Sequence, residues 1–120
     1  MTINQSKLTD VRDYALNLFS TNVTTLEYGS NTTTPTASDA GCLTLIGTTT
    51  ATADTAAAGT VKFRGSIGIS TGNGNTVAEI ALTDGVSDDF SRDLTVPRAK
   101  VATEIFRFTN IVGATVVNKT

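Results

Sequence analysis

The chain has 120 residues and a mass of 12.5 kDa, the size of one domain with a single core. Its 9 basic and 11 acidic residues give a net charge of −2, so the chain has no excess of positive charge that would attract nucleic acid or an anionic membrane. With no histidine and one cysteine, Cys42, an intrachain disulfide is excluded and the commonest general base and metal ligand are missing. We therefore expect no cofactor and no enzymatic activity.

Residues 6–20 predict one amphipathic helix, with polar residues along the side opposite its apolar residues. The apolar residues at helical spacing are Leu8, Val11, Ala15, Leu18 and Phe19. Such a terminal helix either covers one end of the domain core or packs on a neighbouring subunit. No apolar run approaches the roughly 20 residues that a membrane span needs, so we expect no membrane partner.

Residues 23–28 alternate in direction and predict a strand with Leu26 and Tyr28 on one face. A polar loop follows over residues 29–40, and residues 42–46 predict a short apolar strand. The next segment is rich in threonine, which favours β structure, so we expect an irregular but mostly ordered sheet edge over 48–55. A mobile loop is the alternative.

Residues 60–71 show the clearest alternation of apolar and polar side chains and predict a long, half-buried strand. The Gly-Asn-Gly-Asn sequence at 72–75 favours a tight turn, so we predict an antiparallel hairpin with a second strand over 76–82. In that second strand one face carries Ala78, Ile80 and Leu82, and the other carries Val77, Glu79 and Ala81.

The segment that follows is acidic and contains a glycine, which is typical of a solvated loop. Its carboxylates are Asp84, Asp88 and Asp89. A calcium site is the alternative, because several oxygen ligands from one loop could contribute to such a site, but the spacing is not that of the calcium-binding helix-loop-helix.

Residues 90–96 predict another strand that ends at Pro97, followed by a basic turn with Arg98 and Lys100. Residues 103–111 alternate again, but with apolar residues on both faces. We therefore expect this strand to be covered on both sides, one cover being another subunit. Residues 112–117 extend this strand or start a new one.

No set of side chains has catalytic spacing. Glu79 and Asp84 lie at opposite ends of one predicted strand and point to opposite faces. Glu79 and Arg92 lie instead on consecutive strands, which predicts a cross-strand ion pair that positions the strands.

Five features of the sequence, taken in order, carry a family resemblance. They are residues 19–29 (FSTNVTTLEYG), a loop with Thr34-Pro35 and Ser38-Asp39 leading to Leu43, residues 77–84 (VAEIALTD), the triplet Phe90-Ser-Arg92, and Lys100 before the last apolar strand. Together they resemble a family of small virion structural domains from tailed phages. The resemblance spans about residues 19–111. It implies a β-sandwich-like module that serves as a building block or surface appendage of a virus particle.

We accordingly predict a mainly β protein, an antiparallel β-sandwich-like domain over 23–120 preceded by a helical segment over 1–22. Its expected function is that of a non-enzymatic virion protein in the tail, fibre, collar or capsid surface, with copies of itself and other virion proteins as partners. A receptor- or glycan-binding module that uses the threonine-rich loops 29–40 and 47–59, and a filament or pilus subunit, are the alternatives. The residues predicted to serve structure and assembly are Leu8, Val11, Leu18, Phe19, Glu79, Ile80, Leu82, Arg92, Phe106 and Phe108.

Overall fold

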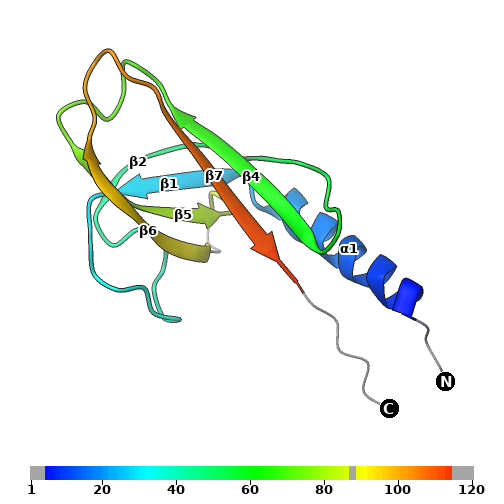
Figure 1. Cartoon of the computed structure of the whole chain (residues 1–120). Coiled ribbons are helices and arrows are strands. Elements are labelled where there is room, and N and C mark those ends of the chain that lie inside the picture. The colour runs from blue at the N-terminus through cyan, green and yellow to red at the C-terminus, as the bar shows by residue number, and fades with distance from the viewer. Residues whose placement is uncertain (1–4, 87–88, 115–120) are drawn as a thin grey trace.

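A computed structural model describes residues 5–86 and 89–114 as one N-terminal helix and two antiparallel β-sheets (Figure 1). The helix is α1 (Gln5–Asn22). The four-stranded sheet has the order β2-β1-β5-β6 and consists of β1 (Thr25–Gly29), β2 (Leu45–Thr50), β5 (Thr76–Thr83) and β6 (Asp89–Ala99). The three-stranded sheet has the order β3-β4-β7 and consists of β3 (Thr52–Ala53), β4 (Thr60–Ile67) and β7 (Phe106–Gly113).

The core lies between the two sheets, so the predicted β-sandwich-like architecture with one N-terminal helix is confirmed. Alternating residues of β1, β4 and β5 point inward because successive side chains of a strand face opposite sides. The most deeply buried core side chains are Leu26, Val61, Phe63, Ile67, Val77 and Leu82. The chain is elongated, with extents of 58 × 27 × 25 Å, and α1 projects beyond the sheets (Figure 1).

The threonine-rich segment is ordered and forms sheet edges, as expected. It supplies β2 at the edge of one sheet and β3 at the edge of the other, with the buried Ala51 between them. The apolar strand predicted over 42–46 was placed wrongly, because β2 begins only at Leu45. The backbone amides of Leu43 and Thr44 instead donate to the carboxylate of Glu79.

The predicted hairpin between residues 60–71 and 76–82 was wrong, since β4 and β5 belong to different sheets. The glycine turn is present, with φ angles of 69° at Gly72 and 82° at Gly74. A glycine-rich turn sequence indicates that the chain reverses direction. It does not indicate which strands pair with each other. β4 pairs along its whole length with β7, and β5 pairs with β1 and β6.

β5 is buried on both faces, because one side meets the core and the other meets the loop that precedes β2. Ile80 and Leu82, predicted to share one face of the strand, face the core. Val77, predicted on the opposite face, also joins the core, since the β5–β6 register shifts between Val77 and Glu79. Such a bulge changes the side to which the following residues point.

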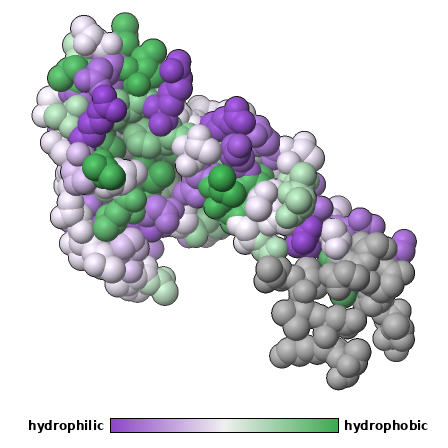
Figure 2. Space-filling model, viewed as in Figure 1, coloured by the Kyte–Doolittle hydropathy of each residue, from purple (hydrophilic) through white to green (hydrophobic). Residues whose placement is uncertain are grey.

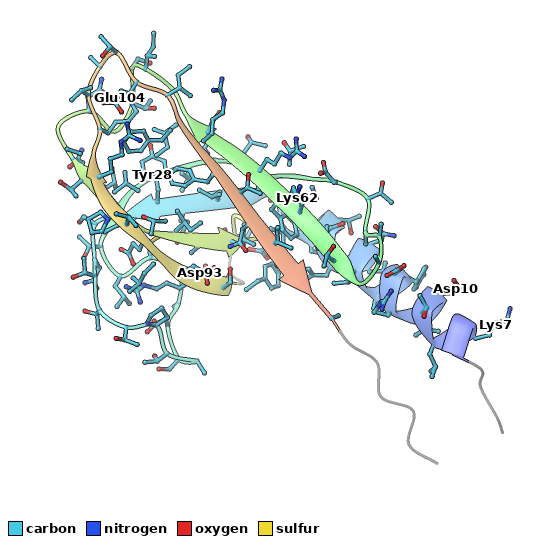
Figure 3. The ribbon with its side chains drawn as sticks, viewed as in Figure 1. Lys7, Asp10, Tyr28, Lys62, Asp93 and Glu104 are labelled. Carbon is cyan, nitrogen blue, oxygen red and sulfur yellow. The ribbon has the colours of Figure 1, made fainter. Side chains whose placement is uncertain are left out.

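Pro97 does not end the sixth strand, because β6 runs on to Ala99. Pro97 is compatible with this position because it lies between Leu94 and Arg98, where the register with β5 shifts and no ladder pair involves it, so its missing backbone donor costs no ladder bond. Asn110 of β7 donates to Asp93 of β6 at 2.9 Å, which ties the two sheets together beside this edge (Figure 3 labels Asp93).

β7 starts later than predicted and, within the single chain, is covered on one face only. Phe106 is buried and Phe108 packs against the core, whereas Arg107, Thr109 and Ile111 are exposed. The possible extension through residues 115–117 lies outside the described residues. A cover over the exposed face by another subunit stays a prediction.

The helix docks with a different side from the one that its apolar pattern predicted. Leu8 and Leu16 are buried, but Val11 and Leu18 are exposed. The supposedly free polar side carries Asp13 and Asn17, whose side chains accept hydrogen bonds from the backbone amides of Gly59 and Ala56. Periodicity missed this docking because polar side chains that pair with backbone donors can be partly buried as well.

The position of Ile80 in the core predicts that Ile80→Asp will prevent folding. The substitution buries a carboxylate without a partner, at a cost comparable to the ~5–15 kcal/mol that stabilises a whole domain. Circular dichroism should show loss of the β-sheet spectrum. The matched control Ile69→Asp changes an isoleucine that is 54% exposed and should leave the spectrum unchanged; equal behaviour of the two variants would contradict the assigned core.

Candidate functional site: a buried ion-pair cluster beneath the 30–44 loop

Glu79 and Arg92 form a buried ion pair on the side of the four-stranded sheet that faces away from the core. Arg92 Nε lies 2.6 Å from Glu79 Oε2, and both side chains are almost fully shielded from solvent. Glu79 is on the central strand β5 and Arg92 is on the adjacent edge strand β6. The cross-strand ion pair predicted from the sequence is therefore present.

The carboxylate of Glu79 also binds both ends of the segment 30–44, called here the 30–44 loop. The backbone amide of Asn31 donates to Oε1 at 3.2 Å, and the amides of Leu43 and Thr44 donate at 3.0 and 2.9 Å. These amides have no strand partner, because the loop enters neither sheet. One carboxylate therefore holds the start and the end of the loop together.

Gly29, where β1 ends, lies directly against this carboxylate. A Cβ atom there would collide with Glu79 Oε1 and with the carbonyl oxygen of Thr44. Glycine at this position lets the backbone approach a buried charge without displacing it.

Arg92 contacts the middle of the same loop through its remaining guanidinium donors. Nη1 donates to the carbonyl oxygen of Thr33 at 2.9 Å and to Asp39 Oδ2 at 3.1 Å, and Nη2 donates to Asn31 Oδ1 at 3.2 Å. Asp39 in turn accepts hydrogen bonds from the backbone amide and the hydroxyl of Thr36. Glu79, Arg92 and Asp39 make up what we call the ion-pair cluster.

These contacts favour the charged forms of the two acids. Burial by itself would raise the pKa of Glu79, but hydrogen bonds from the Thr44 amide, Arg92 and the Leu43 and Asn31 amides outweigh it and hold the pKa below its ordinary value of 4.5. The hydrogen bonds from Thr36 and the charge of Arg92 likewise lower the pKa of Asp39. Both acids and Arg92 are charged at neutral pH.

A second acid, Glu27, holds the loop close to Cys42. Its Oε1 accepts a hydrogen bond from the Cys42 amide at 3.0 Å. Burial, reinforced by the charges of Glu79 and Glu27, raises the pKa of the Cys42 thiol to about 12. The thiolate is the reactive form of cysteine, so the raised pKa keeps Cys42 in its unreactive thiol form at neutral pH.

The ion-pair cluster is suited to holding a loop and not to transferring protons. Glu79 accepts hydrogen bonds from four donors, and its partner charge lies on the next strand. General acid–base catalysis needs a group that can reach a substrate and change its protonation near the working pH. Neither condition is met by a fully buried carboxylate with a lowered pKa.

The acidic segment after β5 lies at a separate hollow of about 280 Å³, which Asp84, Asp89 and Glu27 line from three different segments. Asp88, the third member of the calcium alternative, lies outside the described residues. Within residues 7–86 and 89–114, no group of three or more His, Cys, Asp or Glu side chains is arranged to hold a metal ion.

The other predicted assembly residues are distributed over the whole molecule and do not converge on one site. Ile80, Leu82 and Phe106 are buried, and Phe108 packs edge to face on Phe106 with ring centroids 6.4 Å apart. Phe19 joins the helix to the sheets, with its ring 5.8 Å from that of Phe63 and 5.2 Å from that of Phe90.

Lys100, predicted in a basic turn, is fully buried instead. Its Nζ donates to Asn73 Oδ1 at 2.8 Å and to the carbonyl oxygen of Val101 at 3.3 Å. Its backbone pairs with Gly74 and Asn75, so the residue fastens the end of β6 to the glycine turn. A charge next to a proline and an arginine has the local pattern of an exposed turn, so no signal in the sequence predicts this burial.

Comparison with protein-family models, with curated proteins and with solved structures finds no match to this chain. In the part of the chain that the structure describes, no helix has the length and apolar character needed to cross a membrane.

The ion-pair cluster predicts a large energetic coupling between Glu79 and Arg92. Glu79→Gln and Arg92→Met should each lower the free energy of unfolding by about 3–5 kcal/mol, because each leaves a buried charge without its partner. The double variant should be less destabilised than the sum of the two. Urea unfolding of the four proteins measures the coupling, and strictly additive losses would show that the pair does not act as a unit.

The lowered pKa values predict that acid weakens the fold. The unfolded chain takes up protons near the ordinary values of 4.5 for glutamate and 3.8 for aspartate, whereas folded Glu79 and Asp39 resist protonation. Their stabilising contribution is complete above about pH 5 and declines as the pH falls through the lowered values. Urea unfolding between pH 6 and pH 2.5 should show this decline, and Glu79→Gln should make it shallower. An unchanged slope in the variant would contradict the assignment.

Proposed function

We propose that the chain is a non-enzymatic structural protein of a virus particle, forming a homo-oligomeric part of its tail, fibre, collar or capsid surface. The resemblance of residues 19–111 to small virion domains of tailed phages supports the placement in a particle. The side-chain chemistry of the chain also favours a structural role. Its most elaborate polar cluster holds a loop in place and offers no free catalytic group.

The observation that carries the proposal is an apolar stripe left exposed along α1. Val11, Tyr14 and Leu18 are spaced three and four residues apart and are 60%, 67% and 51% exposed. This spacing places them on one face, whereas Leu16 packs into the core cluster and Leu8 is also buried. A helix that is apolar on a second, unburied side is the form expected of an element that packs on another subunit.

The free edge of β6 offers a second surface for contacts between subunits or with other particle proteins. Among the strands that the structure describes, β6 pairs with β5 alone, and it exposes Leu94 and Val96, the latter by 88%. Figure 2 shows apolar side chains on the surface over β6 and β7. Unpaired strand edges with apolar side chains bind further strands readily, which suits a building block of a larger assembly.

The exposed apolar stripe on α1 predicts that the chain self-associates and that two negative charges introduced into the stripe abolish this association. The unmodified chain should form a discrete oligomer at micromolar concentration, and Val11→Glu/Leu18→Glu should be monomeric because glutamates in an apolar contact are costly to bury. Size-exclusion chromatography with light scattering measures the masses. As a matched control, Ile69→Glu/Val86→Glu places two glutamates at exposed apolar positions outside the helix and should leave the oligomer intact.

A stable monomer of the unmodified chain would contradict the oligomeric part of the proposal. The particle itself is tested by the genes next to the one for this chain. Capsid or tail genes are expected there, and a neighbourhood of metabolic genes would count against a virion protein.

A further inference from the structure

The outer face of the three-stranded sheet carries a hollow that the ion-pair cluster and the exposed helix stripe do not involve. β4 alternates Val61 and Phe63 toward the core with Lys62 and Arg64 toward solvent. The β4–β7 register sets Arg64 opposite Thr109 and Ser66 opposite Arg107, so these side chains share the outer face. Figure 3 labels Lys62 on β4, and Figure 2 shows a hydrophilic patch over this strand.

The hollow has a volume of about 610 Å³ and is bordered by four strands. β4 and β7 form its floor, and the end of β2 with the start of β3 forms one side through Thr49, Thr50 and Thr52. Thr49 is held in place by its hydroxyl, which donates to the carbonyl oxygen of Ser66 at 2.8 Å. The volume falls in the range of about 300–1,000 Å³ that is usual for small-molecule sites.

The charge of this hollow is the opposite of that of the chain. Its charged lining residues are Lys62, Arg64 and Arg107, with no carboxylate among the lining, although acids outnumber bases 11 to 9 in the whole sequence. Arg64 contacts Asp54 outside the hollow at 3.0 Å in a solvent-exposed pair. Among the described residues, Lys62 and Arg107 have no ion-pair partner.

Three like charges on adjacent strands repel one another and contribute nothing to pairing of the strands. A ligand that brings negative charge would relieve this repulsion, and arginine donates two parallel hydrogen bonds to a carboxylate or sulfate. The hydroxyls around the cations supply the second requirement, since Thr50, Thr52, Ser66 and Thr109 can donate to and accept from a hydroxylated ligand. Thr49, whose proton is already donated to Ser66, can accept.

We propose that this hollow, called here the basic groove, binds a short acidic oligosaccharide. Its cations recognise the carboxylate or sulfate groups and its hydroxyl side chains bind the sugar hydroxyls. A nucleic acid fits less well, because three cations make a short patch and Phe108, the one aromatic residue in the lining, packs its ring against the core, where bases cannot stack on it.

This inference does not depend on the proposed place of the chain in a virus particle. The proposed saccharide site lies on the outer face of the three-stranded sheet. Only part of the threonine-rich segment contributes to this site, and the 30–44 loop does not. Failure of the binding experiment would leave the assembly experiments unaffected, and the reverse also holds.

Isothermal titration calorimetry in 50 mM salt tests the proposal with four probes of similar length. The probes are a heparin-derived sulfated hexasaccharide, hexagalacturonate with carboxylates, neutral maltohexaose and single-stranded hexathymidylate. At least one acidic saccharide should bind, and comparison of the sulfated with the carboxylated probe identifies the preferred anion. Maltohexaose and the oligonucleotide should bind at least tenfold more weakly.

Arg107→Gln and Lys62→Gln should each weaken binding of the acidic saccharide by about tenfold, because each removes one charge-assisted contact. Lys7→Gln removes the same charge from the exposed start of α1, outside the groove, and should leave affinity unchanged. Arg107→Gln and Lys62→Gln should keep the unfolding midpoint of the unmodified chain. Absence of binding by both acidic saccharides, equal affinity for the oligonucleotide, or equal loss in the Lys7 variant would overturn the proposal.

Discussion

The burial of two opposite charges beneath the 30–44 loop is the constraint on which the rest of the four-stranded sheet depends. A buried carboxylate is tolerated only when donors surround it, and Glu79 finds them in Arg92 and in three backbone amides of the loop. The loop has almost no apolar side chain of its own in contact with the core. Its conformation is therefore set by polar contacts, and those contacts in turn keep water from the central strand β5.

This arrangement separates the tasks of the two sheets. The four-stranded sheet uses one face for the core and the other for the ion-pair cluster, so its central strand β5 is covered on both faces, whereas the edge strands β2 and β6 remain largely exposed. Only one face of the three-stranded sheet is covered by the core, and its outer face carries the basic groove. The helix, attached through Asp13 and Asn17 as well as by apolar contacts, presents a second apolar side outward. The surfaces suited to partners thus lie away from the charged cluster.

Part of the candidate site followed from the sequence and part did not. Glu79 and Arg92 were predictable as a pair because they occupy consecutive strands with a strong alternating pattern. Asn31, Thr33 and Asp39 were not, since a polar loop without periodicity gives no sign of the side on which it folds back. Lys100 was misjudged for a related reason, because its burial depends on Asn73 in a turn that is distant along the chain.

The sequence by itself determined the local structure: one helix, strands where apolar residues alternate, turns at the glycines, and a sheet edge in the threonine-rich segment. These features depend on side-chain direction and backbone preference over a few residues. Only the tertiary structure decided that β4 pairs with β7 and not with β5, that a bulge turns Val77 into the core, and which side of α1 docks. Those outcomes depend on the total burial and hydrogen bonding reached by segments far apart in the chain, which no local pattern encodes.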